Sequence, residues 1–372
     1  MNLDVPIPSG AEERAHRVAM AAYGSHRPVP RRRSYWKPAV AIVVVAAVAG
    51  VLATPPGRSV ISSIREAVGV KKAQRELFSL PAPGRLLVNS SSGPWVVQQD
   101  GSKRLLGKYT EASWSPFGRF VVAVRSRYEL VTMEPNGKVH WTSAAPAVHL
   151  PSWGGTRTNT RIAYLSTPAW SVRGIAGDGT NGQNLTSCNA VAPVQPAWQP
   201  SSLHVLAVVE ANGRVAVENT PSCEAVFRTA SAFHPTKLQW SSDGKLLLAF
   251  APTALRVYDL HGRVVAQDDP SDATRDVDAT FLPGTHEVAV IRLHGASTSV
   301  FMLSSGMNLF SAGGLRQVVA SPDGRWLLVT WPAADQWVFV RVAAPHTIRA
   351  YSQITRQFGR GTFPEVSGWI GH

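Results

Sequence analysis

From residue 84 to the C-terminus the chain repeats one pattern, in which a polar turn is followed by a basic residue and a short run of β-favouring apolar residues. Seven copies start at positions that are 34 to 43 residues apart, at Arg85, Arg119, Arg161, His204, Lys245, His286 and Arg325. A period of about 40 residues with strand-like content is typical of a β-propeller, in which each repeat is one four-stranded blade. The pattern therefore predicts an all-β fold, a β-propeller over residues 84–372.

The turns between the apolar runs carry their own signal. It is clearest in Trp114-Ser-Pro-Phe-Gly118, Trp240-Ser-Ser-Asp-Gly244 and Ala320-Ser-Pro-Asp-Gly324. Proline presets the second turn position, aspartate bonds back to the backbone and glycine accepts the tight geometry. We expect the aromatic residue before the turn to point into the packing layer between blades. A second, glycine-containing turn closes most repeats, as in Asp100-Gly101 and Asn136-Gly137.

The two ends of the repeat region complete each other. The first repeat begins at Gly84 without an aromatic turn phrase, and the chain ends in Pro364–Trp369, such a phrase without an apolar run after it. This indicates that the C-terminal strand joins the first blade, which removes an exposed sheet edge. The count favours seven blades, and six would hold if the first, shortest unit were only a lead-in.

Residues 1–36 are a polar tail that we predict to be cytoplasmic. Ser9 and Glu12 have the spacing of a capping box, and an apolar stripe at helical spacing follows it. A short helix over residues 10–23 is expected. Its stripe is too narrow for a core of its own, so it is either a frayed, solvated helix or a peptide that docks on a cytoplasmic protein.

Ala39–Thr54 contains sixteen residues without a charge and is rich in valine and alanine. As a helix it spans ~24 Å, and Tyr35, Trp36 and Lys37 extend it at one headgroup level of a hydrocarbon core of ~30 Å. We predict a transmembrane helix over residues 37–55. A cleaved signal peptide is the alternative, because Ala47-Val-Ala49 resembles a cleavage site, but the preceding region is long for that class. A buried helix is a third interpretation.

Basic residues set the orientation. Five precede the uncharged stretch Ala39–Thr54, within eleven residues: Arg27, Arg31, Arg32, Arg33 and Lys37. The positive-inside bias then places the N-terminus in the cytoplasm and the propeller outside a bacterial cell membrane. Residues 56–83 form a juxtamembrane linker with an amphipathic stretch, which could lie on the anionic leaflet or pack beneath the propeller.

The formal net charge of +13 invites a nucleic-acid interpretation, but its distribution argues against one. Residues 1–80 carry a surplus of seven positive charges, and the remaining surplus of six is spread over all the repeats. Phospholipid headgroups beside the predicted span account for the first part. We therefore expect one bilayer span as a partner and no nucleic acid.

The two cysteines, Cys188 and Cys223, lie 35 residues apart, close to one blade period. They could face each other on neighbouring blades as a disulfide if the propeller is exported to an oxidising compartment. The alternative is two unrelated buried thiols.

No catalytic, metal-binding or cofactor-binding motif stands out. The histidines lack the paired spacing of zinc ligands. Gly174–Gly179 is glycine-rich, but its position in an all-β repeat favours a hairpin turn over a phosphate-binding loop. The acidic residues Asp268, Asp269, Asp272, Asp276 and Asp278 match no calcium loop, which favours a solvated inter-strand loop. Trp326, Trp331 and Trp337 are expected in the core between blades, with a recognition surface as the alternative. We therefore expect a protein that is not an enzyme and that binds neither a metal nor a cofactor.

The phrases Trp114-Ser-Pro-Phe-Gly118, Trp240-Ser-Ser-Asp-Gly244 and Ser321-Pro-Asp-Gly-Arg-Trp326 resemble the repeats of TolB-like propellers, bacterial relatives of WD-repeat propellers. This resemblance spans about residues 84–372 and implies a fold used mostly for protein contacts. The whole arrangement also resembles membrane-anchored actinobacterial proteins, and residues 10–19 resemble the cytoplasmic helix of anti-sigma-factor-like members without a zinc motif.

Three functions follow as hypotheses. The first is a membrane-tethered binding or sensing module that takes a protein, peptide or envelope ligand outside the cell, and that signals through residues 10–23 to a cytoplasmic partner such as a sigma factor. The second is an enzyme whose site lies at the mouth of the propeller channel, where loops from different repeats converge. The third is a scaffold for cell-envelope assembly.

Overall fold

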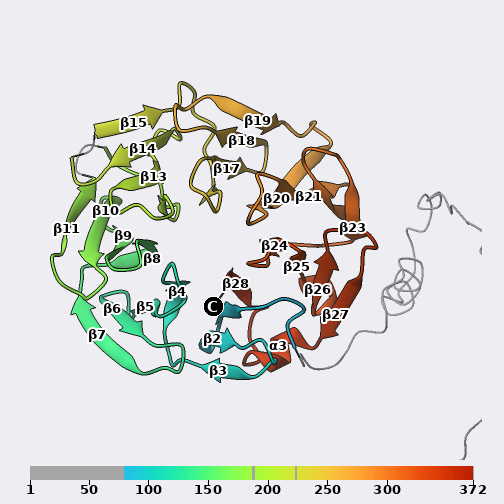
Figure 1. The fold of residues 1–372 in the computed structure, drawn as a ribbon, viewed down its shortest axis with the longest axis horizontal. Helices are drawn as coiled ribbons and strands as arrows, with labels where there is room; N and C mark the ends of the chain where they lie inside the picture. The colour runs from blue at the N-terminus through green and yellow to red at the C-terminus, as the bar shows by residue number, and fades with distance from the viewer. Residues whose placement is uncertain (1–78, 187–188, 223, 372) are drawn as a thin grey trace, which may run out of the picture. The chain divides into compact units, whose positions relative to one another are not determined.

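The computed structural model describes residues 79–186, 189–222 and 224–371, which form a closed ring of β-sheets (Figure 1). The described residues belong to a single compact unit of the chain. The predicted tail, span and juxtamembrane linker up to residue 78 lie outside them, as do both cysteines. Within the described ranges no helix is both long and apolar enough to cross a bilayer.

Seven four-stranded antiparallel sheets make up the ring, so the prediction of seven blades is confirmed. Blades 1 and 2 consist of β28 (Glu365–Ile370), β1 (Arg85–Ser90), β2 (Gly93–Val97) and β3 (Lys103–Leu105), then β4 (Thr110–Trp114), β5 (Val121–Arg125), β6 (Glu129–Met133) and β7 (Val139–Ala144). Blades 3 and 4 consist of β8 (Val148–Gly155), β9 (Thr160–Ser166), β10 (Ser171–Ala176) and β11 (Gln183–Thr186), then β12 (Ala197–Trp198), β13 (Val205–Val209), β14 (Val215–Asn219) and β15 (Glu224–Arg228).

Blades 5 and 6 consist of β16 (Lys237–Trp240), β17 (Leu247–Ala251), β18 (Ala254–Tyr258) and β19 (Val264–Asp268), then β20 (Thr274–Phe281), β21 (Val288–His294), β22 (Ser297–Met302) and β23 (Asn308–Ala312). Blade 7 consists of β24 (Gln317–Ala320), β25 (Trp326–Trp331), β26 (Gln336–Arg341) and β27 (Ile348–Ser352). Two short helical segments interrupt the strands, η1 (Pro332–Ala334) and α3 (Ile354–Gln357).

The C-terminal strand closes the ring. β28 is the innermost strand of blade 1 and pairs antiparallel with β1, with Trp369 opposite Leu86. The predicted closure is thereby confirmed. Because the last strand completes the first sheet, neither end of the repeat region leaves an unpaired inner strand.

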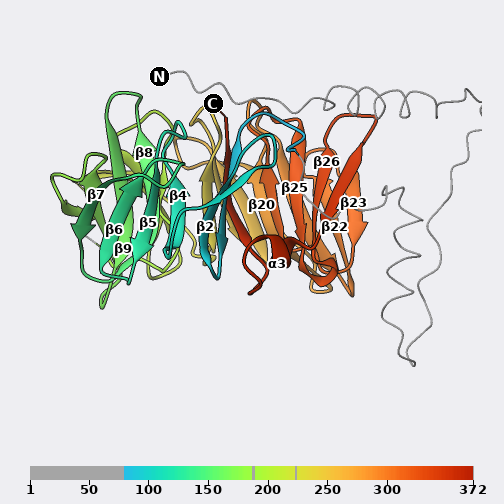
Figure 2. The same ribbon diagram turned by 90° about the horizontal axis from the view of Figure 1, so that it is seen from below.

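The loops divide between two faces of the ring. One face carries α3 and the segments that lead from each blade to the next, and we call it the α3 face (Figure 2). The other, the hairpin face, carries the turns between the first and second and between the third and fourth strands. The predicted glycine turns lie here, and Gly101, Gly137 and Gly179 adopt the positive φ angles that these turns require.

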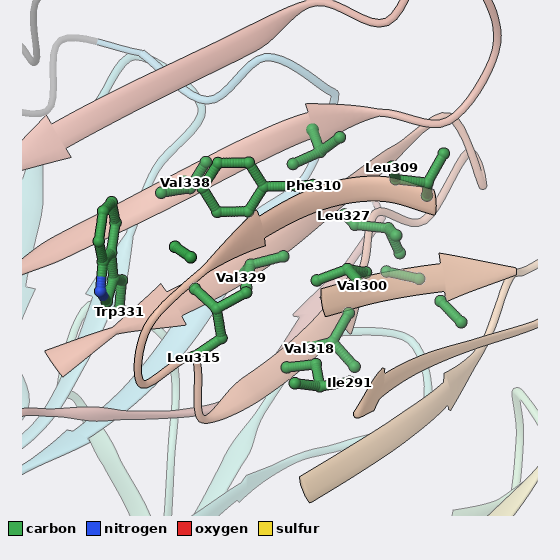
Figure 3. Close-up of a cluster of buried hydrophobic side chains, with 14 of the residues drawn as sticks. Ile291, Val300, Leu309, Phe310, Leu315, Val318, Leu327, Val329, Trp331 and Val338 are labelled. Carbon is green, nitrogen blue, oxygen red and sulfur yellow. The ribbon is translucent and has the colours of Figure 1, made fainter. Parts of the chain in front are cut away.

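The core lies between blades, not inside a single layer. Seven hydrophobic clusters each join two neighbouring blades, one for every junction around the ring. Figure 3 shows the junction of blades 6 and 7, where Ile291 and Val300 meet Leu327, Val329 and Trp331. Successive side chains of a strand point to opposite faces of its sheet. A blade packed on both faces therefore needs the continuous apolar runs that mark each repeat.

The packed structure begins before β1. Leu80 and Ala82 are buried in the cluster between blades 7 and 1. The Leu80 amide donates to the Gln99 carbonyl at 2.8 Å, and the Tyr351 hydroxyl donates to the Ser79 carbonyl at 3.2 Å. The segment that leads into the propeller therefore stabilises the junction at which the ring closes.

The aromatic residue that ends an inner strand packs on the preceding blade. Trp198 lies against Gly154, and its indole N–H donates to the Ser152 carbonyl at 3.2 Å. Trp240 repeats this arrangement by donating to the Ala197 carbonyl at 3.0 Å. The expected position of these aromatics between blades is confirmed.

This packing predicts that Gly154→Ala destabilises the propeller. The new Cβ would lie 2.2 Å from Trp198 Cγ, so a buried indole must move. Overpacking of this kind costs about 1–3 kcal/mol, which we expect as a lower urea midpoint for the full chain. Gly182→Ala is the control, because no heavy atom lies within 4 Å of its Cβ position. Equal midpoints for the two variants would contradict the interpretation.

Candidate functional site at the channel mouth

A channel of about 770 Å³ lies at the centre of the ring. The innermost strands of the blades surround this centre (Figure 1). This volume lies within the roughly 300–1,000 Å³ range of ligand pockets. The segment with α3 leads from blade 7 into β28, and the corresponding inter-blade segments lead into the other inner strands. Each inner strand therefore starts near the α3 face and ends at the hairpin face. The first residues of the inner strands therefore surround the mouth on the α3 face.

Every blade contributes one residue to this mouth, three or four positions before its inner-strand tryptophan or, in blades 6 and 7, before Phe281 and Ala320. We call the set the mouth ring, and it consists of Glu111, Leu150, Gln195, Lys237, Asp278, Gln317 and Glu365. All but Leu150 are polar. Sequence reasoning missed the ring, although its members recur every 39 to 48 residues and could have been found by counting back from each turn phrase.

The mouth ring ties neighbouring blades together. Lys237 Nζ donates to Asp278 Oδ1 at 2.8 Å and to the Ala279 carbonyl at 2.7 Å. Asp278 Oδ2 accepts from the Val318 amide of the next blade at 2.9 Å. One carboxylate thus joins blades 5, 6 and 7. A charge-assisted pair that is half-buried and multiply bonded holds its geometry better than an exposed pair does.

Other members tie the remaining inner strands through backbone groups. Gln317 both donates to the Val366 carbonyl at 2.8 Å and accepts from its amide at 3.0 Å. Glu111 accepts from the Leu150 amide at 2.5 Å, and Gln195 donates to the Pro151 carbonyl at 2.8 Å. These bonds tie the inner strands of blades 2 to 4 to one another, and those of blades 5, 6, 7 and 1 to one another.

Two neighbouring members of the ring have strained backbones. Glu111 and Leu150 have φ angles of 49° and 48°, a left-handed conformation that non-glycine residues seldom adopt. Each lies in an irregularity of its inner strand, where the register shifts against the next strand. Bulges of this kind redirect side chains, and strain of this kind gathers at functional sites. Here they bring Glu111 Oε1 within 3.7 Å of His149 Nδ1.

Two charged side chains at the mouth have no hydrogen-bond or ion-pair partner among the described residues. Arg316 and Glu365 are both exposed and both line the channel. They flank the Gln317–Val366 bonds that join blades 7 and 1. A cation and an anion therefore stand free beside a fixed rim, where they can bind complementary charges.

Comparisons with known proteins identify the fold. No protein-family model matches the chain, and no curated protein matches it in sequence. The C-terminal WD40 domain of Sif2 superposes with a TM-score of 0.56 at 15% identity, covering 76% of this chain and 89% of that one. The β-propeller domain of Myceliophteria thermophila Cps50 (Swd1) superposes with a TM-score of 0.51 at 12% identity, covering 74% and 98%.

KlHsv2 with loop 6CD replaced by a Gly-Ser linker superposes with a TM-score of 0.54 at 13% identity, covering 72% of this chain and 93% of that one. At such low identities these likenesses concern the fold alone. The chain is a seven-bladed propeller whose structural neighbours include WD40 propellers.

Several predicted residues have structural roles. Trp326, Trp331 and Trp337 are buried in the clusters that flank blade 7, so the core interpretation is confirmed. Gly174–Gly179 spans the end of β10 and its turn, as predicted. Within the described ranges no group of three or more His, Cys, Asp or Glu side chains is placed to hold a metal.

The interpretation of the acidic cluster as a solvated loop is wrong for Asp276 and Asp278, which are buried in β20. Asp276 is 1% exposed and accepts from Arg292 Nε at 2.8 Å, while Arg292 also pairs with Asp268. Asp278 belongs to the mouth ring. The register shift at Val277 makes Asp276 and Asp278 the partners of adjacent residues on β21, Arg292 and Ile291. Of the cluster, Asp269 and Asp272 are exposed, and Asp269 pairs with Arg256.

This burial predicts a pH dependence. Desolvation raises the pKa of Asp276 above its ordinary value of 3.8, and the hydrogen bond from Arg292 offsets part of this rise. The folded protein then binds this proton at higher pH than the unfolded chain, so the group favours folding increasingly as pH falls through its folded pKa. We expect the free energy of unfolding of the wild type, relative to that of Asp276→Asn, to increase as the pH falls from 7 to about 4.

Urea unfolding of the full chain across that range measures the difference. Asp272→Asn is the control, because Asp272 is exposed in the loop before β20. A difference between wild type and Asp276→Asn that stays constant or shrinks on acidification would refute the assignment.

Proposed function

We propose that this protein is a non-enzymatic binding module whose channel mouth on the α3 face takes a protein or peptide segment. The observation that carries the proposal is the mouth itself, a rim fixed by inter-blade bonds with Arg316 and Glu365 left free beside it. A preformed site avoids part of the ordering cost of binding. Free charges of both signs suit a polar segment that carries both signs.

We further propose that the module is tethered to a bacterial membrane by residues 37–55, with the propeller outside and residues 10–23 available to a cytoplasmic partner. The support is the uncharged stretch Ala39–Thr54 and the five basic residues that precede it. The resemblance of the repeats to TolB-like propellers agrees with an exported location.

A second candidate function is catalysis at the same mouth. Glu111 and His149 approach each other there, and an acid–base pair on a strained segment is an arrangement that enzymes use. The His149 ring also packs edge-on against Trp170 at 5.2 Å. This candidate requires turnover of a substrate by the full chain that Glu111→Gln and His149→Asn both abolish, with their unfolding midpoints unchanged.

Site-specific photocrosslinking in cells tests the binding proposal. We expect a crosslinking residue at position 316 or 365 to capture a discrete partner band. The same residue at position 264, which is exposed on the outermost strand of blade 5, should not capture it. Exchanging the two charges in Arg316→Glu/Glu365→Arg should weaken capture from a third mouth position, 236, by about tenfold, the effect of ~1.4 kcal/mol in binding. Equal capture from positions 316 and 264 would refute the mouth as the binding site.

Protease treatment of spheroplasts tests the topology. We expect added protease to degrade the propeller and to leave about the first 35 residues protected, the length before the predicted span. Cys188 and Cys223 should resist alkylation until reductant is added, since an exported pair can oxidise. A protected propeller with two freely alkylated thiols would reverse the topology and move the partner into the cytoplasm.

A further inference from the structure

A second, smaller cavity of about 110 Å³ lies in blade 3, away from the channel mouth. Its polar lining consists of Asn159, Arg161, Asn181 and Gln183, and its apolar lining consists of Gly174, Ile175, Ala176 and Leu185. The volume is well below the roughly 300–1,000 Å³ of pockets for drug-sized ligands. The cavity is therefore of a size for one small group and not for a nucleotide or a folded peptide.

Two hairpins on the hairpin face form this cavity. Asn159 ends the turn between β8 and β9, Arg161 lies at the start of β9, and Asn181 and Gln183 follow the turn between β10 and β11. The Gly177 amide donates to the Thr160 carbonyl at 2.8 Å and so joins the two hairpins. The polar groups are thus held on a strand and on two connected turns.

Arg161 is the charged group of the cavity. Its Nη1 atom is buried and has no hydrogen-bond partner within the part of the chain that the structure describes. No ion pair to Arg161 occurs there either. A buried donor without a partner is costly, and such a group calls for a specific explanation, such as a bound ion.

Blade 1 carries an arginine at the same register position, which makes a direct comparison. Arg85 and Arg161 each come one residue before the residue that lies opposite the inner-strand tryptophan. Arg85 Nη2 donates to the Gly118 carbonyl of the next blade at 2.7 Å, and its guanidinium lies over the Trp114 ring. Arg161 has no such carbonyl or ring partner, so its guanidinium fork is free to bind a ligand.

The surroundings of Arg161 favour an anion. No carboxylate lines the cavity, and the side-chain amides of Asn159, Asn181 and Gln183 have no hydrogen-bond partner in the described part of the chain. The nearby Asp178 is engaged by its own turn, where Oδ1 accepts from the amide and the hydroxyl of Thr180 at 3.0 and 2.7 Å. The lining therefore offers one cation and up to three amide donors.

We propose that this cavity, the Arg161 pocket, binds a tetrahedral oxyanion, namely a phosphate or sulfate group. Arginine presents two parallel N–H donors that match the oxygens of such groups, and it does so better than the point charge of lysine. Amide donors from two separate hairpins can reach further oxygens. A carboxylate has only two oxygens and would leave part of this donor set unused. The site is separate from the channel mouth, so it does not depend on the function proposed above.

Titration calorimetry of the full chain with inorganic phosphate tests the proposal, at constant ionic strength and with chloride as the reference anion. We expect saturable binding that Arg161→Gln weakens at least tenfold. Arg157→Gln should keep the affinity within twofold. Arg157 is exposed on the same β8–β9 turn, so that variant removes the same charge from the same hairpin.

Further arms identify the source of the group and guard against misfolding. Inorganic sulfate and glycerol 3-phosphate replace phosphate in parallel titrations, and their relative affinities distinguish a free ion from an ester end group. Asn159→Ala is a second variant in case Arg161→Gln fails to fold. It leaves intact the hydrogen bonds between the Asn159 backbone and Thr156, and it should also weaken binding. The proposal is wrong if neither phosphate nor sulfate binds, or if Arg157→Gln weakens binding as much as Arg161→Gln does.

Discussion

Apolar packing between neighbouring blades is the interaction on which the rest of this propeller depends. Each blade buries both of its faces, and each of the seven hydrophobic clusters is shared by two blades. No blade can satisfy this demand alone, because an isolated sheet would expose two apolar faces to water. The ring must therefore close, and the pairing of β28 with β1 closes it.

Closure also explains the importance of the junction between blades 7 and 1. Leu80 and Ala82 from the segment before β1, Trp326 and Trp337 from blade 7, and Trp369 from β28 share one cluster there. The two ends of the propeller, which are far apart in the chain, thus meet in a single apolar layer. The free charges Arg316 and Glu365 stand at the channel mouth beside the same junction.

Polar groups inside the ring tie strands both between blades and within a single blade. Asp278 bridges three blades through Lys237 and the Val318 amide. Two arginines away from the channel each hold a pair of acids. Arg292 holds Asp268 and Asp276, and a second centre consists of Arg228 with Glu210 and Glu218. Burial raises the pKa of one acid in each centre, Asp276 and Glu218, despite the arginine. These centres add directional bonds to packing that is otherwise non-directional.

The repeat pattern alone predicted the fold class, the closure by the last strand and the burial of the tryptophans, and it favoured seven blades over six. These features follow from short-range rules: alternation within strands, turn chemistry and a period of about 40 residues. Such rules repeat in every blade, so degenerate copies such as Trp153-Gly-Gly155 did not hide them.

Only the tertiary structure decided which polar residues meet. Glu111 reaches His149 because two inner strands carry irregularities with left-handed residues, and no residue type in the sequence marks Glu111 or Leu150 for that conformation. Asp276 and Asp278 separate into a buried ion pair and a channel tie because the register shifts between them. Arg85 and Arg161 look alike in the repeat, yet the guanidinium of Arg85 donates to the next blade, whereas that of Arg161 has no hydrogen-bond partner among the described residues. The contacts of a residue at a blade junction depend on the neighbouring blade, about 40 residues away in the chain, and local sequence rules do not extend that far.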